Sequence, residues 1–256
     1  MTRIFCIANQ KGGVGKTTTT INLAAGLVHL QQKVLLVDLD PQGNATMGSG
    51  IQKANLENSV YQVLLGLSDV HEARQISESG GFDVLPSNRD LSGAEVELVE
   101  LEYREHRLKE ALLKVSDQYD FILIDCPPAL SMLTINGLCA ADGVIIPMQC
   151  EYYALEGLSD LVNTIKHVHA NLNRDLQIIG LLRVMFDKRA TLSQHVSAQL
   201  EKHFGDKVFK TIIPRSVRLA EAPSYGMPGI AFDPRSKGAQ AYIEFGNEML
   251  TWLDRP

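Results

Sequence analysis

Two lysines enclose a cluster of glycines near the start of the chain, in the stretch NQKGGVGKTTTT at residues 9–20. Glycines allow a backbone to approach phosphate oxygens closely, and the positive end of a helix that begins at Lys16 favours an anion. We expect the Lys16 ammonium group to reach the β- and γ-phosphates of a nucleotide and the Thr17 hydroxyl to bind Mg²⁺. The predicted nucleotide-binding loop comprises Lys11, Gly12, Gly13, Val14, Gly15, Lys16, Thr17 and Thr18.

Three carboxylates follow apolar runs that are typical of buried strands. Asp38 and Asp40 end the run VLLVDLD, and their spacing of two places both side chains on one face of a strand. Asp125 ends the run FILID, and such a carboxylate downstream of a phosphate loop holds Mg²⁺, often through water. The alternative for Asp38 and Asp40 is a local role in starting the turn at Pro41.

The elements that must position these groups alternate along the chain between short apolar runs and longer amphipathic segments. Continuous runs of Val, Ile and Leu indicate strands that are covered on both faces. Strand–helix alternation predicts an α/β fold of three layers, a mostly parallel twisted sheet with helices on both faces. Ligands bind at the carboxyl ends of the strands in such sheets. The predicted strands are 4–8, 34–39, 82–85, 121–124, 144–147, 178–184 and 208–213, and the predicted helices are 16–30, 92–116, 131–140, 154–171, 191–204 and 238–253.

Length and composition favour one domain over residues 1–256. The chain has 256 residues, and its 45% hydrophobic content is enough for a substantial core. The first residues run directly into an apolar strand, without a signal peptide or a span of about 20 apolar residues, so we expect a cytoplasmic protein. The four cysteines form no C-x-x-C pair, and we expect them to be buried thiols.

Charge is unevenly distributed along the chain. The formal net charge is −6, yet residues 183–218 contain eight Lys or Arg against three Asp or Glu. Such a stretch is either an ordinary solvated surface or a local footprint for an anionic partner. Charge alone therefore does not exclude nucleic acid.

The phosphate loop departs from the common G-x-x-x-x-G-K-[ST] pattern because Gln10 replaces the first glycine, and the stretch reads K-G-G-V-G-K-T. In this form it resembles the ParA/Soj chromosome-partitioning ATPases of the MinD-like P-loop group. The resemblance extends over almost the whole chain, in VLLVDLDPQGNAT, FILIDCPP, QCEYYALEGL, MFDKR, IPRSVRLAEAPSYG and FDPRSKGAQAY.

The resemblance implies that ATP and Mg²⁺ are the cofactors and that Lys11 and Lys16 have different tasks. Lys16 would serve the nucleotide of its own chain, whereas Lys11 would reach across a face-to-face homodimer to the phosphates of the partner's ATP, as an arginine finger does. By the same resemblance Asp40 activates or orients the attacking water and Asp38 supports the magnesium shell. The segment Pro214–Arg215 would pack near the adenine.

The resemblance also implies a partner for the basic stretch, namely double-stranded DNA bound without base reading. Arg189 and Arg218 match positions of the family's DNA-contacting arginines, and Lys188, Lys202, Lys207, Lys210 and Lys237 would add to the surface. A ParB-like centromere-binding protein would stimulate an otherwise slow ATPase. The larger plasmid relatives carry an extra N-terminal DNA-binding domain, which we do not expect here.

Two alternatives of the same superfamily are a MinD-type membrane-cycling ATPase and a metabolic P-loop enzyme. The first requires a basic amphipathic C-terminal helix, but the tail YIEFGNEMLTWLDRP carries Glu244, Glu248 and Asp254 against Arg255 alone. We therefore expect no membrane partner and a tail that packs on the core through Trp252 and Leu253. The second requires a separate substrate site, for which we find no constellation of residues.

Overall fold

Eight strands form one twisted sheet in the computed structural model, which describes residues 2–152 and 154–253. The strand order is β3-β4-β2-β5-β1-β6-β7-β8, and all neighbours run parallel except β3, which pairs antiparallel with β4. The strands are β1 (Arg3–Ile7), β2 (Val34–Asp38), β3 (Gln75–Ser77), β4 (Phe82–Leu85), β5 (Phe121–Asp125), β6 (Gly143–Met148), β7 (Gln177–Phe186) and β8 (Val208–Pro214). The predicted α/β fold with a mostly parallel sheet is confirmed.

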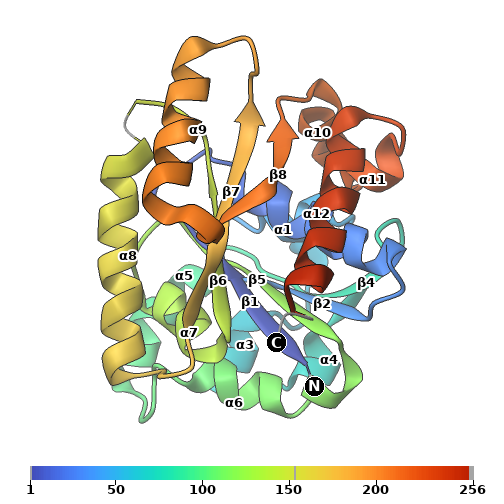
Figure 1. Cartoon of the computed structure of the whole chain (residues 1–256). Coiled ribbons are helices and arrows are strands. Elements are labelled where there is room, and N and C mark those ends of the chain that lie inside the picture. The colour runs from blue at the N-terminus through green and yellow to red at the C-terminus, as the bar shows by residue number, and fades with distance from the viewer. Residues whose placement is uncertain (1, 153, 254–256) are drawn as a thin grey trace.

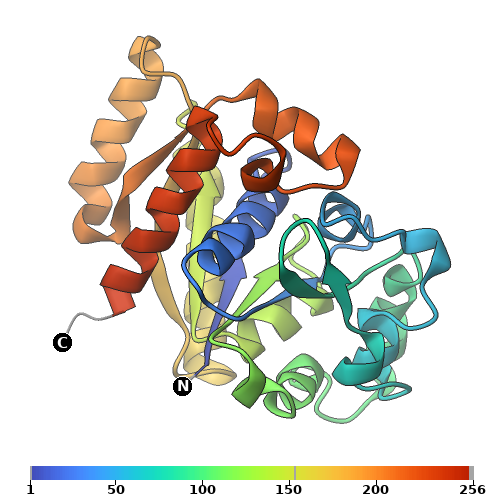
Figure 2. The ribbon, with the colours of Figure 1, turned by 90° about the vertical axis from the view of Figure 1, so that its right-hand side faces the viewer.

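Helices cover both faces of the sheet (Figures 1 and 2). One face carries α1 (Lys16–His29), α2 (Asn44–Gly48), α10 (Val217–Glu221), α11 (Gly229–Phe232) and α12 (Lys237–Leu253). The other carries α3 (Val60–Leu65), α4 (Val70–Ala73), α5 (Leu91–Glu97), α6 (Arg107–Leu113), α7 (Met132–Ala140), α8 (Ala154–Asn171) and α9 (Thr191–Phe204). Both described ends of the chain lie at the lower end of the molecule in Figure 1, opposite α10.

Two apolar cores result from the alternation of side chains along each strand. On β1, Phe5 and Ile7 face the core beneath α1 and α12, whereas Cys6 faces the core beneath α7 and α8. Both cores are continuous with buried side chains of the covering helices, so the central strands are apolar on both faces. This packing fixes the carboxyl ends of β1, β2 and β5 side by side.

The single helix predicted over residues 92–116 is wrong. The structure has α5, a 3₁₀ turn at Leu98–Glu100, a break, and then α6. Tyr103 lies in the break with a φ of 53°, a left-handed conformation that ends a helix. Asn136 of α7 accepts a hydrogen bond from the Leu108 N–H at 3.1 Å and donates to the Arg104 carbonyl at 2.8 Å. A tertiary contact thus supplies the hydrogen bonds that a continuous helix would have made.

The C-terminal helix packs as expected. Trp252 and Leu253 are half-buried against the core beneath α1 and α12, while Asp254 and Arg255 lie outside the described residues. Glu248 of this helix accepts hydrogen bonds from the backbone N–H groups of Lys210 and Thr211, which covers part of the edge of β8. Within residues 2–152 and 154–253, no helix is long and apolar enough to cross a bilayer. The four cysteines are free thiols in the interior, as predicted.

Replacing Asn136 with Ala should destabilise the protein, because the buried Leu108 N–H and Arg104 carbonyl would lose their partner. We expect a loss of about 1–3 kcal/mol in the free energy of unfolding and faster amide hydrogen exchange at Leu108. Denaturant titration measures the first and exchange mass spectrometry the second. Asn247→Ala is the matched control, because this exposed amide bonds only within its own helix. Equal stability of the two variants would contradict the assignment.

Candidate functional site: the carboxyl ends of the central strands

The loop between β1 and α1 forms an open cradle at the carboxyl end of the sheet. Gly13 and Gly15 have φ values of 72° and 80°, a left-handed conformation that glycine adopts without steric cost. Gly15 precedes the first helical residue, and no side chain caps the helix there. Asn9 anchors the loop by donating to the Pro147 carbonyl at 2.8 Å and accepting from the Lys11 N–H at 3.0 Å. The N-terminal N–H groups of α1 are therefore directed at an anion site.

The Lys16 side chain is directed back into this loop. Its Nζ donates to the Lys11 carbonyl at 3.2 Å, and the residue is buried. Burial lowers the pKa of the Lys16 ammonium group, and the nearby negative charges of Asp125 and Asp40 oppose that shift. This arrangement keeps a cation poised where the phosphates of a bound nucleotide would lie.

Asp125 at the end of β5 is held by two threonine hydroxyls of α1. Thr17 Oγ1 donates to Asp125 Oδ2 at 2.7 Å, and Thr20 Oγ1 donates to Asp125 Oδ1 at 3.1 Å. Because the Thr17 proton points to the carboxylate, the lone pairs of this hydroxyl are free to face a cation. The structure therefore brings two of the predicted magnesium ligands into direct contact.

Asp38, the neighbour of Asp125 in the sheet register, is fully buried. Its Oδ2 accepts from the backbone N–H of Thr46 at 2.8 Å and from the Thr46 hydroxyl at 2.7 Å, and its Oδ1 accepts from the Asp40 N–H at 3.1 Å. These contacts fix the turn that carries Asp40. Asp40 is half-buried, and its Oδ1 accepts from the Gln42 N–H at 2.9 Å. Asp38 thus holds the loop of the predicted catalytic carboxylate.

Both buried carboxyl groups have a raised affinity for protons. Burial raises the pKa of Asp125 to about 8, and the charge of Asp38 adds to the effect. Burial also raises the pKa of Asp38 to about 6, against the hydrogen bonds from Thr46. A cation near Asp125 removes this penalty.

The residues fit a nucleoside triphosphate and Mg²⁺ on the observations above. The glycine cradle and Lys16 match phosphate oxygens, and Thr17 with Asp125 is an oxygen donor set of the kind that Mg²⁺ prefers. Thr17 would bind the ion directly through its hydroxyl oxygen. Asp125 would interact with the ion indirectly, through its hydrogen bond with Thr17.

The side chain of Lys11 lies outside the cradle. Its Nζ forms an ion pair with Glu151 Oε2 at 2.8 Å, and both side chains are more than 40% exposed. Thus the two lysines of the loop face different surroundings, one inside the loop and one at the surface. Glu151 was not singled out from the sequence, since 140 positions separate it from Lys11.

An apolar pocket of about 150 Å³ adjoins the cradle between the ends of β7 and β8. Pro214, which we predicted to lie near the adenine, lines this pocket, whereas Arg215 is not among its lining residues. Gly15 and Thr18 of the predicted nucleotide-binding loop also line it, whereas the other walls were not predicted to contact the base. The pocket is lined by Gly15, Thr18, Val184, Met185, Ile213, Pro214, Ser216, Leu219, Ala220 and Tyr242.

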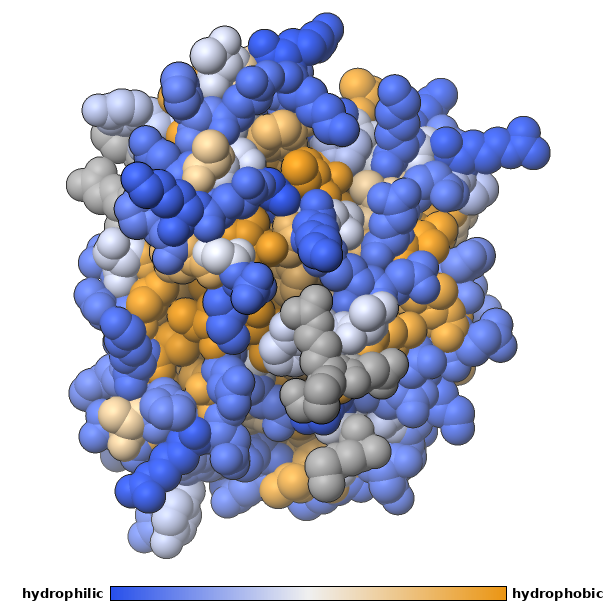
Figure 3. Space-filling model, viewed as in Figure 1, coloured by the Kyte–Doolittle hydropathy of each residue, from blue (hydrophilic) through white to orange (hydrophobic). Residues whose placement is uncertain are grey.

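The predicted DNA-contacting residues fall into two places. Lys188 and Arg189 directly follow β7, and Arg218 lies in α10, so these three exposed residues are at the carboxyl end of the sheet. Arg189 pairs with Asp187, and Arg218 pairs with Glu221 and Asp233. Figure 3 shows hydrophilic residues over most of this upper end. The exposed Lys210 lies lower on β8, in a groove that Trp252 and Glu248 also line.

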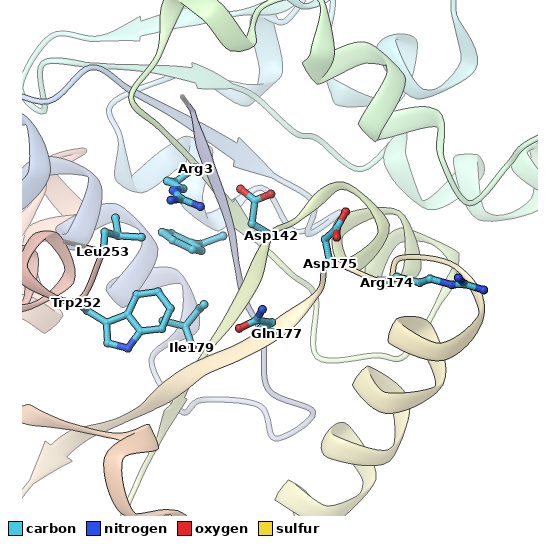
Figure 4. A pocket seen from close by; sticks show the side chains of 9 residues that line it. Arg3, Asp142, Arg174, Asp175, Gln177, Ile179, Trp252 and Leu253 are labelled. Carbon is cyan, nitrogen blue, oxygen red and sulfur yellow. The ribbon is translucent and has the colours of Figure 1, made fainter. Parts of the chain in front are cut away.

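A larger cavity, of about 630 Å³, lies at the opposite end of the sheet (Figure 4). Phe5, Ile179 and Trp252 form its apolar wall, while two arginines and two aspartates surround its mouth. The charges balance and none of the loop residues reaches it, so the cavity has no part in the site described above.

The stability of the protein without nucleotide should fall as the pH rises from about 4 to about 8. The folded Asp125 carboxyl has a pKa raised from 3.8 to about 8, so the folded state binds more protons than the unfolded state throughout this window, and folding weakens as they leave. Asp125→Asn should flatten the profile and raise the free energy of unfolding at pH 8 by about 1–3 kcal/mol. It should also reduce the stabilisation by Mg²⁺ and ATP.

Thermal and denaturant unfolding at pH 5, 6.5 and 8, with and without Mg²⁺ and ATP, measures both effects. Asp142→Asn is the control, because this carboxylate lies at the amino end of β6 and accepts from the Ile4 N–H. A pH-independent wild type would contradict the assignment.

Comparison with known proteins supports the same chemistry. The profile of the AAA domain family matches residues 2–178. The chain is 53% identical to the sporulation initiation inhibitor protein Soj of Bacillus subtilis, over 97% of this chain and 98% of that protein. It is 50% identical to the chromosome partitioning protein ParA of Myxococcus xanthus, over 97% and 88% respectively. The structure of a cobyrinic acid a,c-diamide synthase from Mycobacterium smegmatis with bound ADP and magnesium superimposes with a TM-score of 0.88 at 40% identity, over 99% of this chain and 96% of that chain.

The similarity to Soj and ParA extends over nearly the entire chain, so it includes the loop, the carboxylates and the later motifs alike. The resemblance inferred from K-G-G-V-G-K-T and the downstream motifs is confirmed. This chain belongs to the ParA/Soj family of chromosome-partitioning ATPases, within the AAA domain family.

Proposed function

We propose that this protein is an ATP-dependent dimerising switch that partitions a chromosome or plasmid in the cytoplasm, on the nucleoid. The observation that carries the proposal is the separation of the two loop lysines. Lys16 Nζ lies inside its own loop, whereas Lys11 Nζ pairs with Glu151 at the surface. A single-chain ATPase would have no use for a second loop cation that is held at the surface by a carboxylate.

The reaction is hydrolysis of ATP to ADP and phosphate. Lys16 and the N–H groups of the glycine loop bind the phosphates, and Pro214 packs against the base. Mg²⁺, bound by Thr17 and influenced indirectly by Asp125 through the Thr17 hydroxyl, would offset the negative charge on the β- and γ-phosphates. Asp40 orients the attacking water, and the hydrogen bond from the Gln42 N–H to its Oδ1 fixes the carboxylate. Asp38 holds the Asp40 turn through Thr46.

The second cation arrives from another copy of the chain. When two copies meet face to face, Lys11 leaves Glu151 and approaches the γ-phosphate in the partner's site, where it offsets charge in the transition state. An exposed ion pair contributes little stability, so a phosphate can outcompete Glu151 for this ammonium group. Dimerisation then depends on the γ-phosphate, and hydrolysis ends it.

The dimer binds double-stranded DNA through its phosphates. Arg189 and Arg218 lie at the carboxyl end of the sheet, where their exposed side chains meet only surface carboxylates. Two copies double the patch, so DNA affinity rises steeply with the ATP-bound state. A ParB-like centromere-binding protein then stimulates an otherwise slow hydrolysis, and the dimer leaves the DNA.

A metabolic enzyme is the second candidate, because the similar structure from M. smegmatis is that of a synthase. Its identity to this chain is 40%, against 53% for Soj. The cavity at the other end of the sheet lies away from the loop and does not offer a substrate to the γ-phosphate. Partitioning is therefore the better account.

Lys11→Ala should separate binding from dimerisation. Because Lys11 contributes only its backbone carbonyl to the cradle while its side chain pairs with Glu151, ATP affinity should fall by less than about threefold, the scale of an exposed ion pair, while ATP-dependent dimerisation and hydrolysis are lost. Lys16→Ala should weaken ATP binding itself by at least about tenfold. Nucleotide titration and light scattering distinguish the two variants. If both variants lost ATP binding equally, Lys11 would act on the ATP of its own chain. The proposal that Lys11 acts on the partner's ATP would then be rejected.

Arg189→Glu and Arg218→Glu should each weaken binding to a random DNA duplex by about tenfold or more and reduce its salt dependence. ATP-dependent dimerisation should persist, because neither side chain lies in the cradle. Lys33→Glu, at the amino end of β2, makes the same charge change on the other side of the molecule and should leave DNA binding nearly unchanged. If the arginine variants also stop dimerising, the basic surface and the dimer interface are not separate.

A further inference from the structure

Met185 combines an unusual backbone with an unusual position. It is the next-to-last residue of β7 and has a φ of 50°, a backbone angle that residues other than glycine and asparagine rarely adopt. The sheet register with β8 is irregular between Arg183 and Phe186. A strained residue of this kind persists only where surrounding contacts hold it, and such positions concentrate at functional sites.

The Met185 side chain connects the apolar pocket to the phosphate loop. It lines the pocket, and its Cε lies only 3.3 Å from the position that a Cβ on Gly15 would take. Of the three loop glycines, Gly15 is the one against which Met185 packs, and a Cβ at this position would be in tight contact with the Met185 methyl group. Movement of the thioether would press directly on the residue that precedes α1.

Gln149 completes the connection. Its Nε2 donates to the Met185 sulfur at 2.8 Å and, at the longer distance of 3.4 Å, to the Gly13 carbonyl. Gln149 follows β6 and is not among the residues that line the pocket. One amide thus joins the thioether to the middle of the phosphate loop, two residues before the Glu151 that holds Lys11.

We propose that Met185 and Gln149 are positioning residues that couple filling of the base pocket to the shape of the phosphate loop. A base that enters the pocket packs against the thioether and fixes it. The fixed sulfur then holds the Gln149 amide, which in turn holds the Gly13 turn in the conformation that binds phosphate. A nucleoside triphosphate is favoured over a bare triphosphate by this coupling as well as by direct contact with the base. The proposal rests on the proposed placement of the base between β7 and β8.

The test compares the affinities for Mg²⁺–ATP and Mg²⁺–tripolyphosphate, measured calorimetrically in wild type and variants. The ratio of the two affinities reports the contribution of the base. Gln149→Ala should reduce the ratio by about fivefold, the effect of one hydrogen bond, although this residue does not line the pocket. Met185→Leu keeps the apolar volume and removes the sulfur acceptor, and it should reduce the ratio to the same extent.

The double variant distinguishes coupling from independent effects. Met185→Leu combined with Gln149→Ala should lower the ratio no further than either change alone, because both break one connection. Leu219→Ala, which removes a pocket wall without touching Gln149, should instead add its effect to that of Gln149→Ala.

Three outcomes separate the claims. An unchanged ratio in Gln149→Ala, or additive effects of the Met185 and Gln149 changes, overturns the coupling. An unchanged ratio in Leu219→Ala as well shows that the base lies elsewhere, so the proposed base site itself fails. A reduced ratio in Leu219→Ala with none in Gln149→Ala keeps the base site and rejects only the coupling.

Discussion

The pair of buried carboxylates at the ends of β2 and β5 is the constraint on which the rest of this structure depends. Asp38 and Asp125 are register partners in an apolar sheet and are fully buried. Two negative charges in such a place are costly without donors or a cation. Thr46 supplies donors to one, Thr17 and Thr20 supply donors to the other, and the site is completed by a metal ion and phosphates. A cation beside Asp125 therefore offsets the cost of burying these two groups.

The same end of the sheet carries the groups that the proposed switch requires. Parallel strands bring their carboxyl ends to one edge, so the phosphate loop, the Asp40 turn and the segments after β7 and β8 become neighbours although they are far apart in sequence. The Lys11 side chain is paired with Glu151 at this surface. The exposed Arg189 and Arg218 lie in the segments after β7 and β8. In the proposed switch, a change in the phosphates would therefore affect the contact between two copies and, through it, the surface offered to DNA.

Much of this arrangement was predictable because its signals are local. Continuous apolar runs predicted seven of the strands, and K-G-G-V-G-K-T with the strand-end aspartates predicted the cradle. The three-residue β3 carries too few side chains for a pattern, and the break before α6 depends on Asn136, a residue 28 positions from Leu108. Glu151, Gln149 and Met185 were missed for the same physical reason. They lie in the quoted stretches QCEYYALEGL and MFDKR, but their contacts join segments that are far apart in the sequence, and no local pattern shows such contacts.

Binding of the protein to a random DNA duplex, with ATP, with ADP and without nucleotide, tests the central claim most directly. The wild type and Asp40→Ala should be compared over a range of salt concentrations, since loss of the catalytic carboxylate is expected to trap the ATP state. The account predicts binding only with ATP, strengthened in Asp40→Ala and weakened by salt. Indifference to DNA in every state, while Asp40→Ala forms dimers with ATP, would contradict it.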